Sequence, residues 1–367
     1  MKKYFSSLGT LVALLYLFNF NIEAQSLKPG FSKTELSSAL LINSRTGTDS
    51  SAFEGLPEPS GFDFVYRSPE IGLLNIWELW TAPENDKAIV SIRGTTPDIV
   101  SWLANFYAAM VPAQGTLILS EKDTFHYKLA ENPRASIHVG WLTSTAYLSE
   151  DILPKIDSLY NKGMKNFIIT GHSQGGAITY LLTAYLVNLQ NDGKLPSDIQ
   201  FKTYSTAAPK PGNLHFAYEY EKRAQEGWAF NVVNSIDWVP ETPFSIQTLD
   251  DFNTINPFTN ARETIIKKQK FPQRLVMRRI YNQLDKPSKK ARKEYQKYLG
   301  KMISGQIQKS LPGYQPPEYF NSNHYVRTGN FIILHPESDY FEIYPEEADD
   351  IWRHHGFKAY FFLIEKI

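Results

Sequence analysis

The sequence predicts an α/β fold in which helices flank a mostly parallel central sheet. Short apolar runs of strand length occur at 87–92, 166–170, 199–204 and 229–233, and a longer run of helical size lies at 177–189. Strands that alternate with helices build parallel βαβ units. The strand-like runs are almost continuously apolar, as expected for strands covered on both faces.

The amino-acid composition limits the kinds of binding partner and of catalytic chemistry that we expect. The 367 residues are 42% hydrophobic and 21% charged, and the formal net charge is zero, so we expect no nucleic-acid partner. Cysteine is absent, which excludes disulfides, thiol nucleophiles and thiolate metal ligands. The chain has no His-Glu-x-x-His motif. We therefore expect no metal and no cofactor.

The first residues resemble a targeting segment. Lys2 and Lys3 precede a mostly apolar run at 8–20, and Ala24 offers a small residue before Gln25. This pattern is typical of a secretory signal peptide at 1–24, cleaved after Ala24, and predicts a secreted or periplasmic protein. The alternative is an uncleaved anchor, but the run is shorter than the ~20 residues that a membrane span needs. We expect residues 25–367 to form one domain.

One region departs from the regular alternation of strands and helices. Residues 262–309 carry fifteen basic residues against three acidic ones, and two apolar stripes recur there at helical spacing. We therefore expect a basic helical insertion at about 250–316, with a helix that begins after Pro272. Packing of both stripes onto the parent domain is the leading interpretation, and contact with a membrane is the alternative. The stripes comprise Leu275, Val276, Ile280 and Leu284, and then Tyr295, Tyr298, Leu299, Met302, Ile303 and Ile307.

A short motif points to a nucleophile. Residues 171–175, Gly-His-Ser-Gln-Gly, match G-x-S-x-G and lie between a strand-like and a helix-like run. In this motif the serine sits on a strained strand-to-helix turn, and the two glycines leave room for neighbouring backbone. The helix N-terminus behind the serine favours a developing oxyanion. Ser173 is thus the predicted nucleophile; the alternative is a glycine-rich turn without a catalytic role.

Several blocks together resemble one family, the class 3 or fungal-lipase-like lipases of the α/β-hydrolase fold. They occur in family order between about 87 and 243. Order and spacing make the resemblance more specific than any single block. The blocks are Val-Ser-Ile-Arg-Gly-Thr at 90–95, His-Val-Gly-Trp at 138–141, the Gly-His-Ser-Gln-Gly-Gly turn at 171–176, Ala-Pro-Lys-Pro-Gly-Asn at 208–213, and Val-Asn-Ser-Ile-Asp-Trp-Val-Pro at 233–240.

The resemblance implies a catalytic triad in the chain order Ser, Asp, His. Ser173 would be the nucleophile and Asp237 the acid, although Asp237 could simply form a turn before Val-Pro. The backbone amides of Thr95 and Gln174 would form the oxyanion hole. Gln174 stands where the family usually has Leu, and Ser101 where it usually has Asp.

Three histidines compete for the role of the base. Residues 355–360, His-Gly-Phe-Lys-Ala-Tyr, are similar to the C-terminal block that carries the base in plant-type members. His355 is therefore the predicted base. His324 is the main alternative, in a stretch that resembles a strand following the family's acid block. His354 is the third candidate, but on a helix it would point roughly 100° away from its neighbour.

An apolar stretch after the oxyanion block predicts a lid. In fungal-type members a short lid helix lies here, and its apolar face would cover the site in water and open at a lipid interface. An ordinary core-facing helix is the alternative. The side chains concerned are Trp102, Leu103, Phe106, Tyr107, Met110 and Val111.

The resemblance implies a serine ester hydrolase that forms an acyl-enzyme. The expected substrates are lipid esters, which covers a triacylglycerol lipase, a phospholipase A1 and a carboxylesterase, with transient contact with a membrane or lipid interface. One alternative is an esterase for feruloyl or other carbohydrate esters. The other is a non-catalytic binding protein of the lipase fold.

Overall fold

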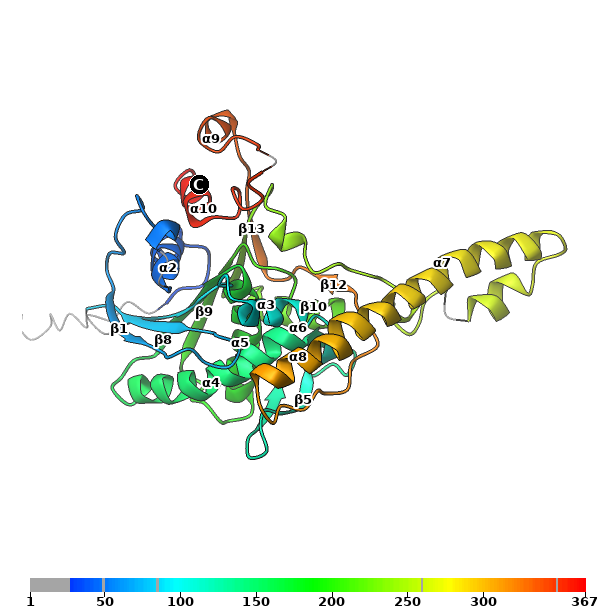
Figure 1. Ribbon diagram of the computed structural model, residues 1–367, viewed down its shortest axis with the longest axis horizontal. Helices are drawn as coiled ribbons and strands as arrows, with labels where there is room; N and C mark the ends of the chain where they lie inside the picture. The colour runs from blue at the N-terminus through cyan, green and yellow to red at the C-terminus, as the bar shows by residue number, and fades with distance from the viewer. Residues whose placement is uncertain (1–26, 48–49, 84–85, 259, 348) are drawn as a thin grey trace, which may run out of the picture.

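The computed structural model describes residues 27–47, 50–83, 86–258, 260–347 and 349–367 (Figure 1). The predicted signal peptide at 1–24, with its cleavage point after Ala24, lies outside the described residues. Among the helices that are described, none is both long enough and apolar enough to cross a membrane.

A seven-stranded sheet forms the centre of the molecule, with the strand order β1-β2-β3-β8-β9-β11-β13. β1, β2 and β3 pair antiparallel, and all pairs from β3 to β13 are parallel. The predicted α/β class and mostly parallel sheet are therefore confirmed. The strands are β1 (Asp63–Arg67), β2 (Trp77–Thr81), β3 (Ala88–Ile92), β8 (Asn166–His172), β9 (Gln200–Thr206), β11 (Ala229–Asn234) and β13 (Asn330–Leu334).

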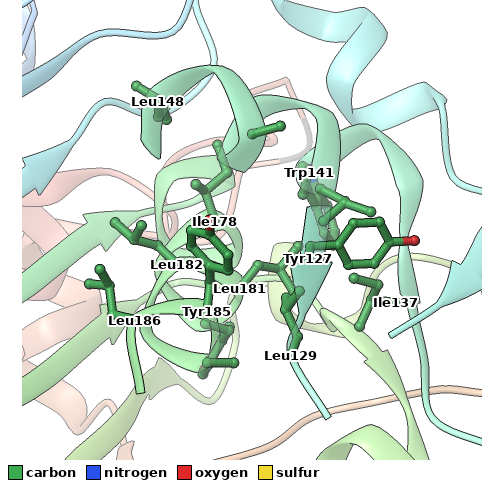
Figure 2. Close-up of a cluster of buried hydrophobic side chains, with 14 of the residues drawn as sticks. Tyr127, Leu129, Ile137, Trp141, Leu148, Ile178, Leu181, Leu182, Tyr185 and Leu186 are labelled. Atoms are coloured by element: carbon green, nitrogen blue, oxygen red, sulfur yellow. The ribbon is translucent and has the colours of Figure 1, made fainter. Parts of the chain in front are cut away.

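Helices cover both faces of this sheet. Alternate residues of one strand enter different cores, because successive side chains of a strand point to opposite faces. Phe167 and Ile169 of β8 join the core beneath α4 (Val139–Tyr160) and α5 (Gln174–Asn191), and Ile168 joins the core beneath α2 (Lys33–Arg45) and α10 (Phe357–Ile364). Figure 2 shows the packing of α4 against α5. Each such side chain stabilises the fold by about 1.5–3 kcal/mol.

Smaller elements surround the main sheet. A second sheet has the order β12-β10-β7-β4, and β5 and β6 form a hairpin. Except for β12, which lies in the stretch near His324 that resembles a family strand, these short strands were not predicted from the sequence. They are β4 (Met110–Pro112), β5 (Gln114–Ile118), β6 (Thr124–Lys128), β7 (Ser136–His138), β10 (Gly212–Asn213) and β12 (Tyr325–Val326); the other helices are α3 (Ile99–Phe106), α6 (Leu214–Ala224) and α9 (Ser338–Ile343), with short turns η1 (Ser50–Ala52), η2 (Val239–Glu241), η3 (Leu249–Asp251) and η4 (Arg262–Ile266).

A long helical segment extends away from the body of the molecule (Figure 1). α7 (Gln273–Gln296) begins directly after Pro272, as predicted, and continues through η5 (Lys297–Met302) into α8 (Ile303–Ser310). Tyr295 and Ile307 are buried, whereas Ile280 and Leu284 are exposed. The expectation that both stripes pack onto the domain is therefore wrong for the first stripe, because α7 projects beyond the body.

The predicted lid stretch also divides into two parts. Tyr107, Met110 and Val111 are completely buried, and Leu103 is nearly so, which makes these four core residues rather than lid residues. They are buried because α3 packs against α4 and α8 and β4 pairs with β7. Trp102 and Phe106 remain on the outer face of α3, with their rings stacked at 5.6 Å.

Candidate active site at the carboxyl edge of the sheet

Ser173 occupies a sharp turn between β8 and α5. Its φ is +59° and its ψ is −130°, a conformation that is strained for a residue with a side chain. A side chain at Gly175 would approach the carbonyl oxygen of Ile92 to 2.2 Å, and one at Gly171 would meet Gly175 at 2.3 Å. The two motif glycines are therefore required by close backbone contact. The turn leaves Ser173 partly exposed at the carboxyl edge of the sheet.

Asp237 and His355 meet at the same edge. Asp237 follows β11, and His355 lies two residues before α10. His355 Nδ1 donates a hydrogen bond of 2.8 Å to Asp237 Oδ2, and the Asp237 side chain is completely buried. With Nδ1 as the donor, Nε2 of the neutral ring is free to accept a proton.

Two further donors hold the Asp237 carboxylate. The Val239 backbone N–H donates to Oδ1 at 3.0 Å, and the Tyr360 hydroxyl donates to Oδ2 at 2.8 Å. The Tyr360 oxygen in turn accepts from the Asn234 N–H at 3.1 Å. Both carboxylate oxygens are thus fixed in direction, as a group that must orient an imidazole requires. The sequence analysis had included Tyr360 in the C-terminal block but not as a partner of Asp237.

His172 links the serine turn to the segment that carries His355. Its Nε2 donates to the His355 carbonyl oxygen at 2.7 Å, its Nδ1 lies 2.9 Å from Thr206 Oγ1, and the two imidazole rings are 4.8 Å apart. Burial, followed by the neighbouring His355, holds the pKa of His172 well below its usual range. His172, whose burial disfavours the charged form, is therefore a structural link between residue 173 and residue 355.

The two predicted oxyanion residues lie together beside Ser173. A side chain at Gly94 would come within 3.6 Å of Ser173 Cβ, so the loop that carries Thr95 borders the serine. Thr95 Oγ1 donates to Gln174 Oε1 at 3.4 Å. Gln174 is the first residue of α5, so its backbone N–H has no acceptor within the helix.

Asn105 and His138 support the loop that carries Thr95. Asn105 donates to Thr95 Oγ1 at 2.9 Å, and it accepts from Trp141 Nε1 at 3.0 Å. The ring of His138 is stacked on Trp141 at 3.6 Å, and burial lowers the pKa of His138 to about 3. The sequence analysis placed His138 and Trp141 in a family block but assigned them no role. Their position indicates support for the Thr95 loop.

The competing histidines lie elsewhere. His354 Nδ1 is bonded to the Tyr340 hydroxyl at 2.9 Å, so the ring turns toward α9. His324 precedes β12 of the second sheet, where its electrostatic neighbours are Asp251 and Lys210. Among the described residues, His355 is the one of the three candidates that forms a hydrogen bond with Asp237.

Three tryptophans form an aromatic cluster beside His355. The Trp352 ring lies 5.6 Å from the His355 ring, 5.0 Å from Trp238 and 6.1 Å from Trp102. Trp238 also donates from Nε1 to the Ile351 carbonyl oxygen at 2.8 Å. The cluster therefore joins the segments that carry Thr95, Asp237 and His355 into one apolar border.

A mostly parallel sheet with a serine turn at its carboxyl edge and an Asp–His pair beside it defines an α/β-hydrolase. Residues 89–247 match the family described as Lipase (class 3). Over these residues, somewhat less than half of the chain, the protein is similar to the class 3 lipase family.

Individual relatives cover limited parts of the chains. A triacylglycerol lipase of Ricinus communis is 31% identical over 129 residues, which are 34% of this chain and 24% of that protein. This chain therefore spans about a quarter of that relative's length. The Rhizomucor miehei lipase–propeptide complex is similar at 17% identity and a TM-score of 0.42, over 59% of this chain and 65% of that one. A lipase of Yarrowia lipolytica is similar at 17% identity and a TM-score of 0.43, over 60% and 77%.

Proposed function

We propose that this protein is a serine ester hydrolase that acts on lipid esters. The observation that carries the proposal is the 2.8 Å bond between His355 and buried Asp237, at the edge where Ser173 occupies a strained turn. The match of residues 89–247 to the family described as Lipase (class 3) supports the same reaction class.

In the proposed mechanism, Ser173 Oγ attacks the ester carbonyl carbon while His355 Nε2 takes the hydroxyl proton. The oxyanion rests on the backbone amides of Thr95 and Gln174. His355 then gives its proton to the leaving alcohol, and an acyl-enzyme remains on Ser173. A water molecule, deprotonated by the same histidine, attacks this acyl group, releases the acid and restores the serine. Asp237 stays ionised and stabilises the imidazolium.

The aromatic border favours apolar acyl groups. Trp102, Trp238 and Trp352 offer a large apolar surface next to His355. The name of the Ricinus communis relative, triacylglycerol lipase, points the same way. We therefore include triacylglycerols, phospholipids and short carboxylic esters among the proposed substrates, and we propose that the protein is exported by the segment at 1–24.

Hydrolysis of p-nitrophenyl butyrate by the wild type and Ser173→Ala tests the mechanism. We expect kcat to fall by at least about a thousandfold, because loss of a triad nucleophile removes the covalent route. Ser158→Ala, an exposed serine on α4, is the matched control and should keep full activity. Activity should also survive EDTA. A Ser173→Ala protein that retains wild-type kcat would disprove the role of the serine.

The substrate class needs its own measurement. Purified protein is offered tributyrin, phosphatidylcholine and methyl ferulate, and we expect the first two to be cleaved faster. Preference for methyl ferulate would favour a carbohydrate-ester esterase. No turnover of any ester by the folded wild type would favour a non-catalytic binding protein.

A further inference from the structure

The outer part of the helical segment displays apolar side chains to solvent. We call residues 252–291 the arm. Leu284 is 71% exposed and Ile280 is 55% exposed, although both belong to one stripe of α7. Ile255, in the loop that returns toward α7, is 97% exposed. Exposed apolar groups gathered on one element mark an interaction surface more often than scattered single residues do.

The rest of the chain leaves a cavity beside the apolar stripe of α7. A cavity of about 490 Å³ opens between α7 and the segment 247–266. Phe252 and Phe258 line one side, and Ile280 and Leu284 line the other. The arm therefore offers an apolar surface with depth, which its own residues leave open.

Positive charge lies on the other side of the same helix. Arg278, Arg279, Lys286 and Lys290 are exposed, and in the described part of the chain none of the four has a carboxylate within ion-pair distance. At 100° per residue they fall on the side of α7 away from Ile280 and Leu284. A helix with an apolar face and a polar face rich in Lys and Arg is the kind that lies in the plane of a membrane interface.

We propose that the arm docks on the surface of a bilayer that contains anionic phospholipids. Residues 262–309 carry a large excess of positive charge in a chain whose total is zero, so the attraction to anionic headgroups is local to this segment. A second copy of the chain fits less well, because a symmetric contact would bring two positive arms together. Nucleic acid would match the positive charge of the arm but would leave its exposed aliphatic side chains in water.

The proposal goes beyond ester hydrolysis, and its test needs no turnover. Vesicles of ether-linked phosphatidylcholine, with or without about 30 mol% ether-linked phosphatidylglycerol, contain no carboxylic ester for the proposed hydrolase to cleave. Partition of the full chain is measured by co-sedimentation. We expect binding only to the anionic vesicles, weakened when salt is raised to about 0.5 M.

Two sets of variants test the apolar and the basic side chains of the arm. Ile280→Glu with Leu284→Glu should weaken partition by at least about tenfold, since two charges would enter the apolar boundary. Lys286→Gln with Lys290→Gln should weaken it by about tenfold as well. The matched controls are Ile343→Glu, at an exposed site on α9, and Lys194→Gln with Lys222→Gln; both should bind as the wild type does.

A fluorescent label reports where the arm lies. The chain has no cysteine, so Ile280→Cys and Leu284→Cys accept one environment-sensitive dye each, with Ile343→Cys as the control. We expect a blue shift and quenching by brominated alkyl chains of the ether-linked lipids at 280 and 284 only. Partition that is equal with and without phosphatidylglycerol, unchanged in the arm variants, or without a blue shift would overturn the proposal. A change in oligomer mass, or in binding to duplex DNA, in place of the change in partition would overturn it too.

Discussion

The carboxyl edge of the sheet buries its Asp–His pair and fixes it by hydrogen bonds, whereas the arm exposes many of its side chains to solvent. At the edge, Asp237 is buried and both of its carboxylate oxygens accept hydrogen bonds. On the arm, Leu284 is exposed and Lys286 lacks an ion pair in the described structure. Chemistry at one bond requires fixed geometry, whereas contact with a fluid interface requires accessible surface. Substitutions at the edge should therefore change rates, and substitutions on the arm should change partition.

Removal of the catalytic base, His355, should have the largest effect at the carboxyl edge. His355→Ala should lower kcat by about ten-thousandfold or more, because the serine would lose its proton acceptor. His354→Ala and His324→Ala should keep most of the wild-type kcat, because their rings contact Tyr340 and the surroundings of Asp251 instead. Initial rates on p-nitrophenyl butyrate, with circular dichroism as the folding check, measure all three. An inactive His324→Ala beside an active His355→Ala would refute the assignment.

The next largest effect concerns Tyr360. Tyr360→Phe deletes the donor to Asp237 Oδ2 and leaves the Asn234 N–H without its acceptor. We expect kcat to fall by about tenfold with KM unchanged, since the carboxylate would hold the imidazole less firmly. Thermal denaturation should show a loss of about 1–3 kcal/mol for the buried unpaired amide. A stability loss with unchanged kcat would restrict Tyr360 to a structural role.

Local sequence patterns predicted the parts that local chemistry determines. The apolar runs at 166–170 and 229–233 became β8 and β11, and the glycines around Ser173 are explained by backbone contacts within the turn and with β3. The resemblance to the class 3 lipases, rather than a local pattern, suggested Asp237 and His355, whose catalytic roles stay a prediction. Each of these residues follows a strand or precedes a helix, positions that a sequence pattern can locate.

Contacts between residues far apart in the chain could not be predicted from the sequence. The bond from His172 to the His355 carbonyl spans 183 residues, and the bond from Tyr360 to Asp237 spans 123. No periodicity encodes such pairs. The two stripes of the basic segment also look alike in sequence, and only tertiary packing decides that Tyr295 is buried and Ile280 exposed. Very short strands such as β4 and β10, three and two residues long, are too short to give an alternating pattern.

The smallest predicted effect tests whether the aromatic border serves the acyl group or the catalytic histidine. The Trp352 ring is 40% exposed and lies between Trp238 and His355. Trp352→Ala should raise KM for a long-chain p-nitrophenyl ester by up to about tenfold, since an aromatic contact of this kind is worth about 0.5–1.5 kcal/mol. KM for p-nitrophenyl acetate should stay unchanged, because a two-carbon acyl group makes little contact with the aromatic border.

Trp352→Phe is the matched variant, because it keeps an aromatic face at the same position. It should retain most of the long-chain preference if apolar area is what Trp352 contributes. Steady-state kinetics on acetate, butyrate and palmitate esters give KM and kcat separately. An equal loss of kcat on all three esters would mean that Trp352 acts by holding the His355 ring, with which it is in contact, and the acyl preference would then have to come from another part of the edge.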